Sequence, residues 1–377
     1  MPKRVNFVSI QQSHGVACNG YSASAVRTGY EQVLIHRVGE GYGKVADKDG
    51  QVVSRDERGI KVQYKDGTTE NIAVGRRFGI AAAGLTIAHE LVSDYKEGQK
   101  FKQGDVLMYN SGFFERDQLN PKSVVWKAGV LVRVALLESR ETHEDASSIS
   151  KSLAEKLVTK TTKVKNIVVG FDQKVSNLLK VGEVVDHSTI LCAIEDSTTA
   201  GSQMFDNDSL NTLRLLSSQT PQAKVKGVIE RIEVFYHGDK EDMHPSLKAI
   251  ADASDKELAA RNRAQGKPAF NGSVDESFRV EGDSLMLDTL AIRVYITSDV
   301  PAGIGDKGVL ANQMKSVISD VMEHEVTTES GEPIDVIFGA QSIFNRIVTS
   351  PFIIGTTTTL LGIVGKKAAS IYRNEKP

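Results

Sequence analysis

Cysteine is scarce in this sequence, and its spacing excludes two common kinds of small-domain scaffold. The 377 residues include only two cysteines, Cys18 and Cys192. Two distant cysteines cannot build a disulfide framework, and neither belongs to the paired spacing of a zinc site. This usage is typical of a reducing compartment, and we expect both side chains to be buried as small apolar residues.

Long hydrophobic runs are also missing. The first ten residues, MPKRVNFVSI, lack the apolar core of a signal peptide. The most apolar segment, Pro351 to Val364, is too short and too rich in threonine to span a bilayer. We therefore expect a cytoplasmic protein without a transmembrane segment.

Neither sign of charge is in large excess. The chain has 46 Lys and Arg against 48 Asp and Glu, a formal net charge of −2. Such a balance argues against a grip on nucleic acid by the whole surface. Any site for a polyanion must be a local cluster or lie at a junction with another subunit.

Standard catalytic motifs are absent as well. The sequence has no P-loop, no HExxH, no GxSxG and no glycine-rich dinucleotide turn that opens a helix after a strand. The eight histidines are scattered, without metal-ligand spacing. We do not expect this chain to build a metal site alone.

Short strand-like runs separated by glycine and aspartate fill residues 32–137 and indicate a β-rich region. The Asp-Gly pairs at 49–50 and 66–67 predict hairpin turns, because glycine accepts a positive φ. A similar phrase occurs at 95–110 and again at 178–195, with a glycine turn followed by apolar residues. Each is typical of a barrel-sandwich hairpin, although two unrelated hairpins would fit equally well.

Three segments have helical patterns. Residues 143–160 begin as a loop and become a helix, with Leu153 and Leu157 four apart and Ser147 or Ser148 as the cap. Residues 245–265 predict a charged, solvated helical arm. A polar excursion at 196–222 contains a short apolar helix, LNTLRLL.

Two groups of polar residues are candidates for chemistry. Lys307 and Lys315 stand eight residues apart behind a Gly-Asp turn, where a solvated loop is the simpler interpretation. Glu144 and Asp145 follow a strand-like run at the point where we expect a helix to begin. Their carboxylates could cap that helix, or they could help to hold a metal ion or its water shell.

Read in order, several phrases resemble the C-terminal half of the β subunit of multisubunit DNA-dependent RNA polymerases. THEDASSIS resembles a family phrase containing Glu-Asp-Ala, and LAIRVYI leads into Gly-Asp-Lys with a second lysine eight residues on. GEPIDVIFGAQSIFNRIV resembles the family segment that ends in an arginine turn and places Arg346 at that arginine. SIQQSHG, VRTGYE and the two repeated phrases also match in order, so the resemblance runs from about residue 5 to about residue 365.

The chain departs from the family pattern at several positions. Ala311 to Met314 replace an Arg-His-Gly-Asn run, His143 replaces a tyrosine-like residue, and an Asn-Pro pair before the arginine is missing. The match begins midway through the β subunit and stops before its final segment. The resemblance therefore predicts a naturally split β subunit, similar to those of large-genome bacteriophages, with a cloned fragment as the alternative.

The resemblance implies a β-rich α+β fold that includes a double-psi β-barrel, barrel-sandwich hairpins, a flap-like excursion and a helical insertion. The implied divisions are a hybrid-facing segment at 1–53, a barrel-sandwich-like region at 54–130, the double-psi barrel at 131–156 and 285–350, a flap-like region with a helical arm at 157–284, and a C-terminal helical tail at 351–377.

The resemblance also implies roles for the basic residues. Lys307 and Lys315 would meet the RNA 3′-terminal phosphate and the α-phosphate region of the incoming nucleotide. Arg346 would bind the β and γ phosphates, because only a guanidinium can do so in a bidentate manner. Mg²⁺ would be held mainly by aspartates of a partner β′-like chain, so this chain should be inactive alone.

Further implied positions are the acidic pair and the hybrid-facing residues. Glu144 and Asp145 would lie near the second metal ion and act through water or by orienting basic side chains. The residues implied to lie near the RNA or the hybrid are Gln11, Gln12, Lys3 and Arg4.

The implied partners are a β N-terminal-like chain, β′-like chains, the DNA template, the RNA transcript and nucleoside triphosphates. Leu210, Leu213 and Leu216 would form a flap tip that binds a sigma-like initiation factor. Transcription by this assembly would take place in the cytoplasm of a bacterial host or in a phage-made compartment there. The alternatives are a non-catalytic, polymerase-like scaffold or virion protein, and a stand-alone barrel enzyme.

Overall fold

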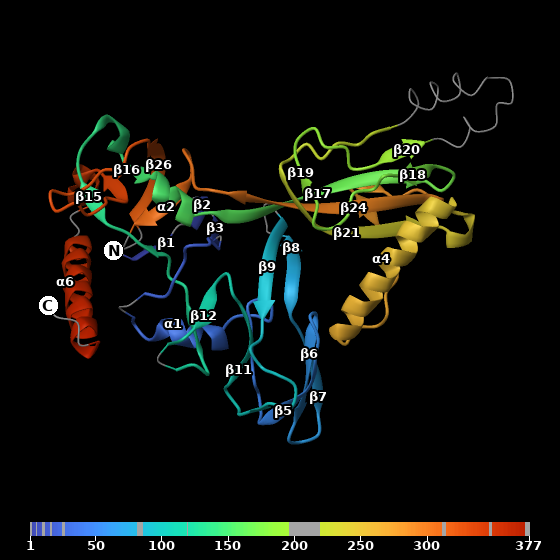
Figure 1. The fold of residues 1–377 in the computed structure, drawn as a ribbon, viewed down its shortest axis with the longest axis horizontal. Helices are drawn as coiled ribbons and strands as arrows, with labels where there is room; N and C mark the ends of the chain where they lie inside the picture. The colour runs from blue at the N-terminus through green and yellow to red at the C-terminus, as the bar shows by residue number, and fades with distance from the viewer. Residues whose placement is uncertain are drawn as a thin grey trace.

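Figure 1 shows a computed structural model in which strands dominate and form several separate sheets. The described residues are 2–4, 6–9, 12–15, 17–24, 27–80, 86–118, 120–195, 219–310, 314–346 and 349–373, with side chains described from residue 17 onward except at residue 80. The predicted excursion at 196–222 therefore lies largely outside the described residues, and so does its helix at 210–216.

A seven-stranded mixed sheet draws its strands from both ends of the chain. Two neighbouring pairs, β16–β26 and β15–β27, are parallel, and the other pairs are antiparallel. In sheet order the strands are β14 (Val130–Leu131), β1 (Pro2–Arg4), β25 (Lys307–Leu310), β26 (Met314–Met322), β16 (Ala146–Ser150), β27 (Val336–Phe338) and β15 (Val134–Leu136). Among the described residues this order is open at both edges, so the predicted β-rich α+β fold is observed without a closed barrel.

The two longest strands of an eight-stranded sheet, β17 and β24, run side by side along the long axis of the molecule in Figure 1, whereas β8 and β9 of the same sheet run across it. After β24 the chain enters the seven-stranded sheet. Strand β24 therefore connects two lobes, one built on the eight-stranded sheet and the other on the seven-stranded sheet. In order the strands are β19 (Val184–Val185), β21 (Gly227–His237), β24 (Thr289–Val300), β17 (Thr159–Gly170), β9 (Thr86–Val92), β11 (Val106–Asn110) and β4 (Gly43–Val45), with β8 (Gly75–Ile80) paired to β9.

The remaining strands form smaller sheets. The four-stranded sheet contains, in order, β10 (Lys100–Phe101), β5 (Gly50–Arg55), β6 (Gly59–Tyr64) and β7 (Thr69–Ala73). The two-stranded sheets are β12 (Phe114–Arg116) with β13 (Val124–Trp126), β18 (Lys174–Ser176) with β20 (Ala193–Glu195), β2 (Asn6–Ser9) with β3 (Gln12–Gly15), and β22 (Arg279–Val280) with β23 (Asp283–Ser284).

Among the described residues helices are few, and most of them are short. The α-helices are α1 (Tyr30–Val33), α2 (Lys151–Lys156), α4 (Pro245–Ala264), α5 (Ala340–Phe344) and α6 (Ser350–Tyr372), and the 3₁₀ turns are η1 (Leu34–His36), η2 (Arg140–Thr142) and η4 (Lys240–Asp242). Within the described ranges, every helix is too short or too polar to cross a bilayer.

Each of the two lobes has its own large apolar cluster. One joins β17, β21 and β24 to α4 and includes Cys192, and the other lies against the seven-stranded sheet and includes Cys18. Both cysteines are buried and neither forms a disulfide within the described chain, which confirms the interpretation of them as buried small residues. Burial raises the pKa of each thiol to about 11, so both stay protonated near neutral pH.

Only one of the two predicted Asp-Gly turns is a hairpin. Gly67 has a φ of 85° and connects the paired strands β6 and β7, as predicted. The prediction at 49–50 was wrong: this pair lies between β4 and β5, which pair with different strands, and Gly50 begins β5.

The repeated phrases are not hairpins, because the strands within each phrase pair with strands elsewhere. Strand β10 pairs with β5 and β11 with β4 and β9, while β19 pairs with β21 and β20 with β18. Each glycine turn nevertheless makes the same two backbone hydrogen bonds to a neighbouring strand. In both cases they lie at the point where that strand shifts its register against its own partner in the sheet. In the first phrase Gly98 N donates to Val52 O (2.8 Å) and Val52 N to Gln99 O (2.9 Å), and in the second Gly182 N donates to Ile229 O (2.7 Å) and Ile229 N to Glu183 O (2.9 Å). The two phrases therefore share one local structure.

Two of the three predicted helices, α2 and α4, lie within the described residues, and each prediction needed a correction. The N-cap of α2 is Ser150, whose hydroxyl accepts from Leu153 N at 3.1 Å, because Ser147 and Ser148 belong to β16. Helix α4 matches the predicted segment but is not a solvated arm, since Leu247, Ala251 and Leu258 are buried. An apolar stripe every three or four residues explains this packing.

Candidate functional site

The predicted Gly-Asp turn is a compact structure that directs the chain into β25. Gly305 has a φ of 93°, which is strained for residues with a Cβ. The Asp306 carboxylate accepts from Gly303 N at 2.9 Å, and Ile318 N donates to Asp306 O at 2.8 Å. Glycine and aspartate are therefore both required here, the first for its backbone and the second for its side chain.

Lys307 and Lys315 lie on adjacent strands and not in a loop. In the antiparallel pair β25–β26, Lys307 is opposite Val317, and Val309 is opposite Lys315. Directly opposite residues share a face and the side chains alternate along a strand, so both lysines project from the same face. Lys315 is exposed and Lys307 half-buried, and within the described residues neither has an ion-pair or hydrogen-bond partner.

The acidic pair is placed beside this hairpin by the next strand of the sheet. Val317 is also the register partner of Ala146 in β16, and Val317 N donates to Asp145 O at 3.2 Å. Lys307, Val317 and Ala146 thus form one row across three strands, which spans about 10 Å at the usual strand spacing. Residues more than 150 positions apart in the chain meet in this row.

Glu144 and Asp145 have an unusual backbone. Their φ angles are 50° and 68°, so two successive non-glycine residues are left-handed, each at a cost of about 1–3 kcal/mol. Ser319 Oγ supports the turn from the other side, since it lies within hydrogen-bond distance of the carbonyl oxygens of Glu141 and Ser147.

The helix-capping interpretation of this acidic pair was wrong. Asp145 is followed by β16, and α2 begins only at Lys151. The strand intervenes because residues 146–150 pair with both β26 and β27, which the local sequence does not reveal.

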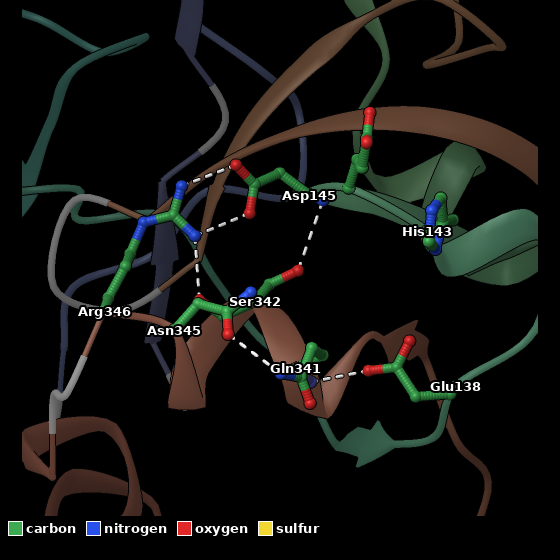
Figure 2. Close-up of a pocket in the computed structure, with 8 residues that line it drawn as sticks. Glu138, His143, Asp145, Gln341, Ser342, Asn345 and Arg346 are labelled. Carbon is green, nitrogen blue, oxygen red and sulfur yellow. Dashed lines mark hydrogen bonds and ion pairs between the residues drawn. The ribbon is translucent and has the colours of Figure 1, made fainter.

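Arg346 lies just after α5 and grips Asp145 with both of its terminal nitrogens (Figure 2). Nη1 donates to Oδ1 at 2.6 Å and Nη2 to Oδ2 at 2.5 Å, while Nη1 also donates to Ser342 O at 2.8 Å. This pair lowers the pKa of Asp145 and raises that of Arg346, mainly through the hydrogen bonds between them. Both side chains are partly exposed, so we expect the pair to contribute at most about 1 kcal/mol to stability.

A pocket of about 620 Å³ opens beside this ion pair. The residues that line it are Glu138, His143, Glu144, Asp145, Gln341, Ser342, Asn345 and Arg346. Gln341 N donates to Glu138 Oε1 at 2.5 Å, and Asp145 N donates to Ser342 Oγ at 3.2 Å, so α5 and the acidic turn are fastened together (Figure 2).

Sequence reasoning missed five of the lining residues: Glu138, His143, Gln341, Ser342 and Asn345. A signal for three of them was present, because polar side chains at positions 341, 342 and 345 precede Arg346 with the spacing of one helical face. Glu138 has no such local signal, since only the sheet brings it to α5.

The carboxylates of the pocket do not form a metal site. Among the described residues no group of three His, Cys, Asp or Glu side chains could hold a metal ion. The Asp145 carboxylate is occupied by Arg346, whereas Glu144 is exposed and makes no hydrogen bond to the described part of the chain. Glu144 could therefore give one oxygen ligand to a Mg²⁺ ion held mainly by another chain, which is how this ion is often bound.

The other predicted site residues are only partly described. Strand β1 places Lys3 opposite Leu310 and Arg4 opposite Val309, next to the lysine hairpin. Gln12 lies in β3 opposite Ser9. Gln11 lies outside the described residues, as do Leu210, Leu213 and Leu216.

Comparison with known proteins does not identify a family or a function for this site. The sequence matches no protein-family model, and no curated protein matches it.

Proposed function

We propose that this chain is the C-terminal part of the β subunit of a multisubunit DNA-dependent RNA polymerase, of the split kind found in large-genome bacteriophages. It completes the active centre by binding the RNA 3′ end and the nucleotide phosphates. The observation that supports this most strongly is the pairing of β25, β26 and β16, which brings the hairpin that carries both lysines beside the Glu144–Asp145 turn and, through Asp145, near Arg346. A scaffold has no physical need for these residues together.

We also propose that the seven-stranded sheet belongs to a double-psi β-barrel and that the two glycine-turn phrases belong to barrel-sandwich elements. The parallel pairs β16–β26 and β15–β27 support the first assignment, because each joins segments far apart in the chain. The shared hydrogen-bond pattern of the two turns supports the second.

In this proposal the two lysines supply positive charge where nucleotidyl transfer moves negative charge among phosphate oxygens. Neither ammonium group is committed to a partner in the described chain, and both face the same side of the hairpin. They could therefore reach two phosphates of one substrate complex, the RNA 3′-terminal phosphate and the α-phosphate of the nucleotide.

The guanidinium of Arg346 is bound along one edge, and its other edge is available to a ligand. A guanidinium has five N–H donors, and three of them are used by Asp145 and Ser342. The Nε–H and one Nη2–H are left for a second bidentate contact, the geometry that suits β and γ phosphate oxygens. Asp145 would thus orient the arginine.

Mg²⁺ would be held by aspartates of a β′-like partner, where two metal ions clamp the attacking and leaving oxygens. This chain would contribute the Glu144 carboxylate at the edge of that site. Lys3, Arg4, Gln11 and Gln12 would face the RNA–DNA hybrid, and the leucines at 210, 213 and 216 would meet an initiation factor. A β N-terminal-like chain and the DNA template complete the assembly.

The test is nucleotide addition by the assembled complex carrying Lys307→Ala or Lys315→Ala. Loss of one preorganised charge should slow extension about 100- to 1000-fold while assembly stays intact. The matched control is Lys163→Ala, because Lys163 is an exposed lysine of β17 in the other sheet. Near-normal extension by both lysine variants would remove them from the mechanism, and a complex that forms without any extension activity would favour the scaffold.

A further inference from the structure

Helix α6 is the most exposed apolar element of the described chain. It extends over Ser350–Tyr372 and should be about 35 Å long at 1.5 Å per residue. Only Pro351 is buried, and the ring of Phe352 stacks on Phe344 with their centroids 6.0 Å apart. In Figure 1 the helix projects from the lobe of the seven-stranded sheet, so only its first turn is anchored.

The exposed apolar residues of α6 form a stripe. Ile353, Leu360, Val364 and Ile371 follow one another at spacings of seven, four and seven, which places them on one face of the helix. Their exposed fractions lie between 58% and 66%. Leu361 lies on one flank of the stripe and Ile363 on the other, so the apolar face of the helix is broad.

This helix is poorly suited to stand alone in water. It contains four consecutive threonines and three glycines, which have low helix propensity. Helical segments of this kind gain most of their stability from packing of an apolar face, and here that face is uncovered. Its sequence therefore fits a helix that is covered by another surface.

The charge of α6 indicates what that surface is. The helix has no acidic residue, and its cations are Lys366, Lys367 and the C-cap Arg373. All three lie in the C-terminal third, at the end where cations also favour the helix dipole. A complementary surface would be apolar along most of its length and acidic at one end.

We infer that α6 docks into an apolar groove with an acidic rim on another protein chain, in the manner of a helix-in-groove interaction. A second copy of α6 is a poorer occupant, because the helix has no acidic residue to offer these cations in either a parallel or an antiparallel pair. A lipid surface is poorer too, since membrane-surface helices usually carry their cations along the polar face, whereas these are grouped at one end. This inference does not depend on the polymerase proposal.

The test uses the full chain and two designed helical-hairpin probes. Both probes have the same leucine-lined groove, but one has glutamates along its rim and the other lysines. Fluorescence anisotropy should show that the glutamate-rimmed probe binds at least about tenfold more tightly, which corresponds to a few partly exposed ion pairs.

Variants of α6 make the result specific. Val364→Glu, in the stripe, should abolish binding, whereas the control Thr359→Glu, on the opposite side of the helix, should not. The double variant Lys366→Glu with Lys367→Glu should reverse the preference between the probes. Circular dichroism of each variant checks that the chain is folded.

Three outcomes would overturn the inference. Equal affinity for the two probes would mean non-specific adhesion. A dimer in analytical ultracentrifugation that Val364→Glu dissociates would make a second copy the occupant. Preferential binding of α6 to phosphatidylglycerol vesicles over the glutamate-rimmed probe would make a lipid surface the target.

Discussion

At the scale of single residues, the candidate site depends on backbone conformations that few residues adopt. Glu144, Asp145 and Gly305 all have positive φ, and all three lie beside the row that contains Lys307. Left-handed residues often mark functional turns, because the surrounding structure must compensate for their cost. The side chains of the site are therefore placed by strained turns at the ends of regular strands.

Gly305 and Gly303 offer a matched test of this strain. An added Cβ would meet nothing within 4 Å at either position, but only Gly305 has a positive φ. Gly305→Ala should thus lower the free energy of unfolding by about 1 kcal/mol, while Gly303→Ala should leave it unchanged or raise it slightly. Urea denaturation of both variants measures the difference, and equal effects would contradict the argument.

The Asp145–Arg346 pair predicts a pH-dependent contribution to stability. The pKa of Asp145 is lowered from its ordinary value of 3.8 by the hydrogen bonds from Arg346. A lowered folded-state pKa stabilises the native state above the unfolded pKa, and this stabilisation is lost as the pH falls through the folded pKa. Asp145→Asn should therefore cost up to about 1 kcal/mol at pH 7 and almost nothing near pH 2.

Urea denaturation of Asp145→Asn and the parent chain at both pH values provides the check. The control is Glu144→Gln, because the exposed Glu144 carboxylate makes no hydrogen bond or ion pair with the described part of the chain and its loss should leave stability unchanged at both pH values. A difference that is the same at pH 7 and pH 2 would show that the pair is not the cause.

At the scale of elements, a buried charged cluster fastens α4 to the eight-stranded sheet. Glu233 in β21 is 7% exposed and accepts from Arg261 Nη1 at 2.5 Å and Tyr295 Oη at 2.9 Å. The guanidinium of Arg231 lies over the ring of Phe78 in β8, 4.6 Å from its centroid. This cluster joins a helix to strands of three different segments.

Glu233→Ala should be strongly destabilising, because it removes the buried carboxylate that is the counter-charge of the partly buried Arg231 and Arg261. We expect a loss of about 3 kcal/mol in the free energy of unfolding. The matched control is Glu257→Ala, which removes an exposed ion pair with Arg58 and should cost less than about 1 kcal/mol. If urea denaturation gives similar values for the two variants, the cluster does not stabilise the junction.

At the scale of the whole molecule, sequence patterns predicted the local features and missed the long-range pairing. Gly67, the burial of Cys18 and Cys192, and the helix at 245–265 follow from local rules of turn, composition and periodicity. Local rules do not predict the position of β16, the partners of the repeated phrases or the approach of Glu138 to α5. Each of these depends on segments far away in the chain. The family resemblance implied that Glu144 and Asp145 could orient basic side chains, but neither the resemblance nor a local pattern identified Arg346 as the partner of Asp145.

The interleaved strand order of the seven-stranded sheet has a consequence for synthesis of the protein. Strand β1 pairs with β25, so Lys3 cannot reach its register partner until Leu310 has been synthesised. At a translation rate of about 5–20 residues per second, that interval is about 15–60 s. Strands β17, β21 and β24 can pair before β25 is complete, whereas the sheet that carries the lysines is completed later, because β1 pairs with β25.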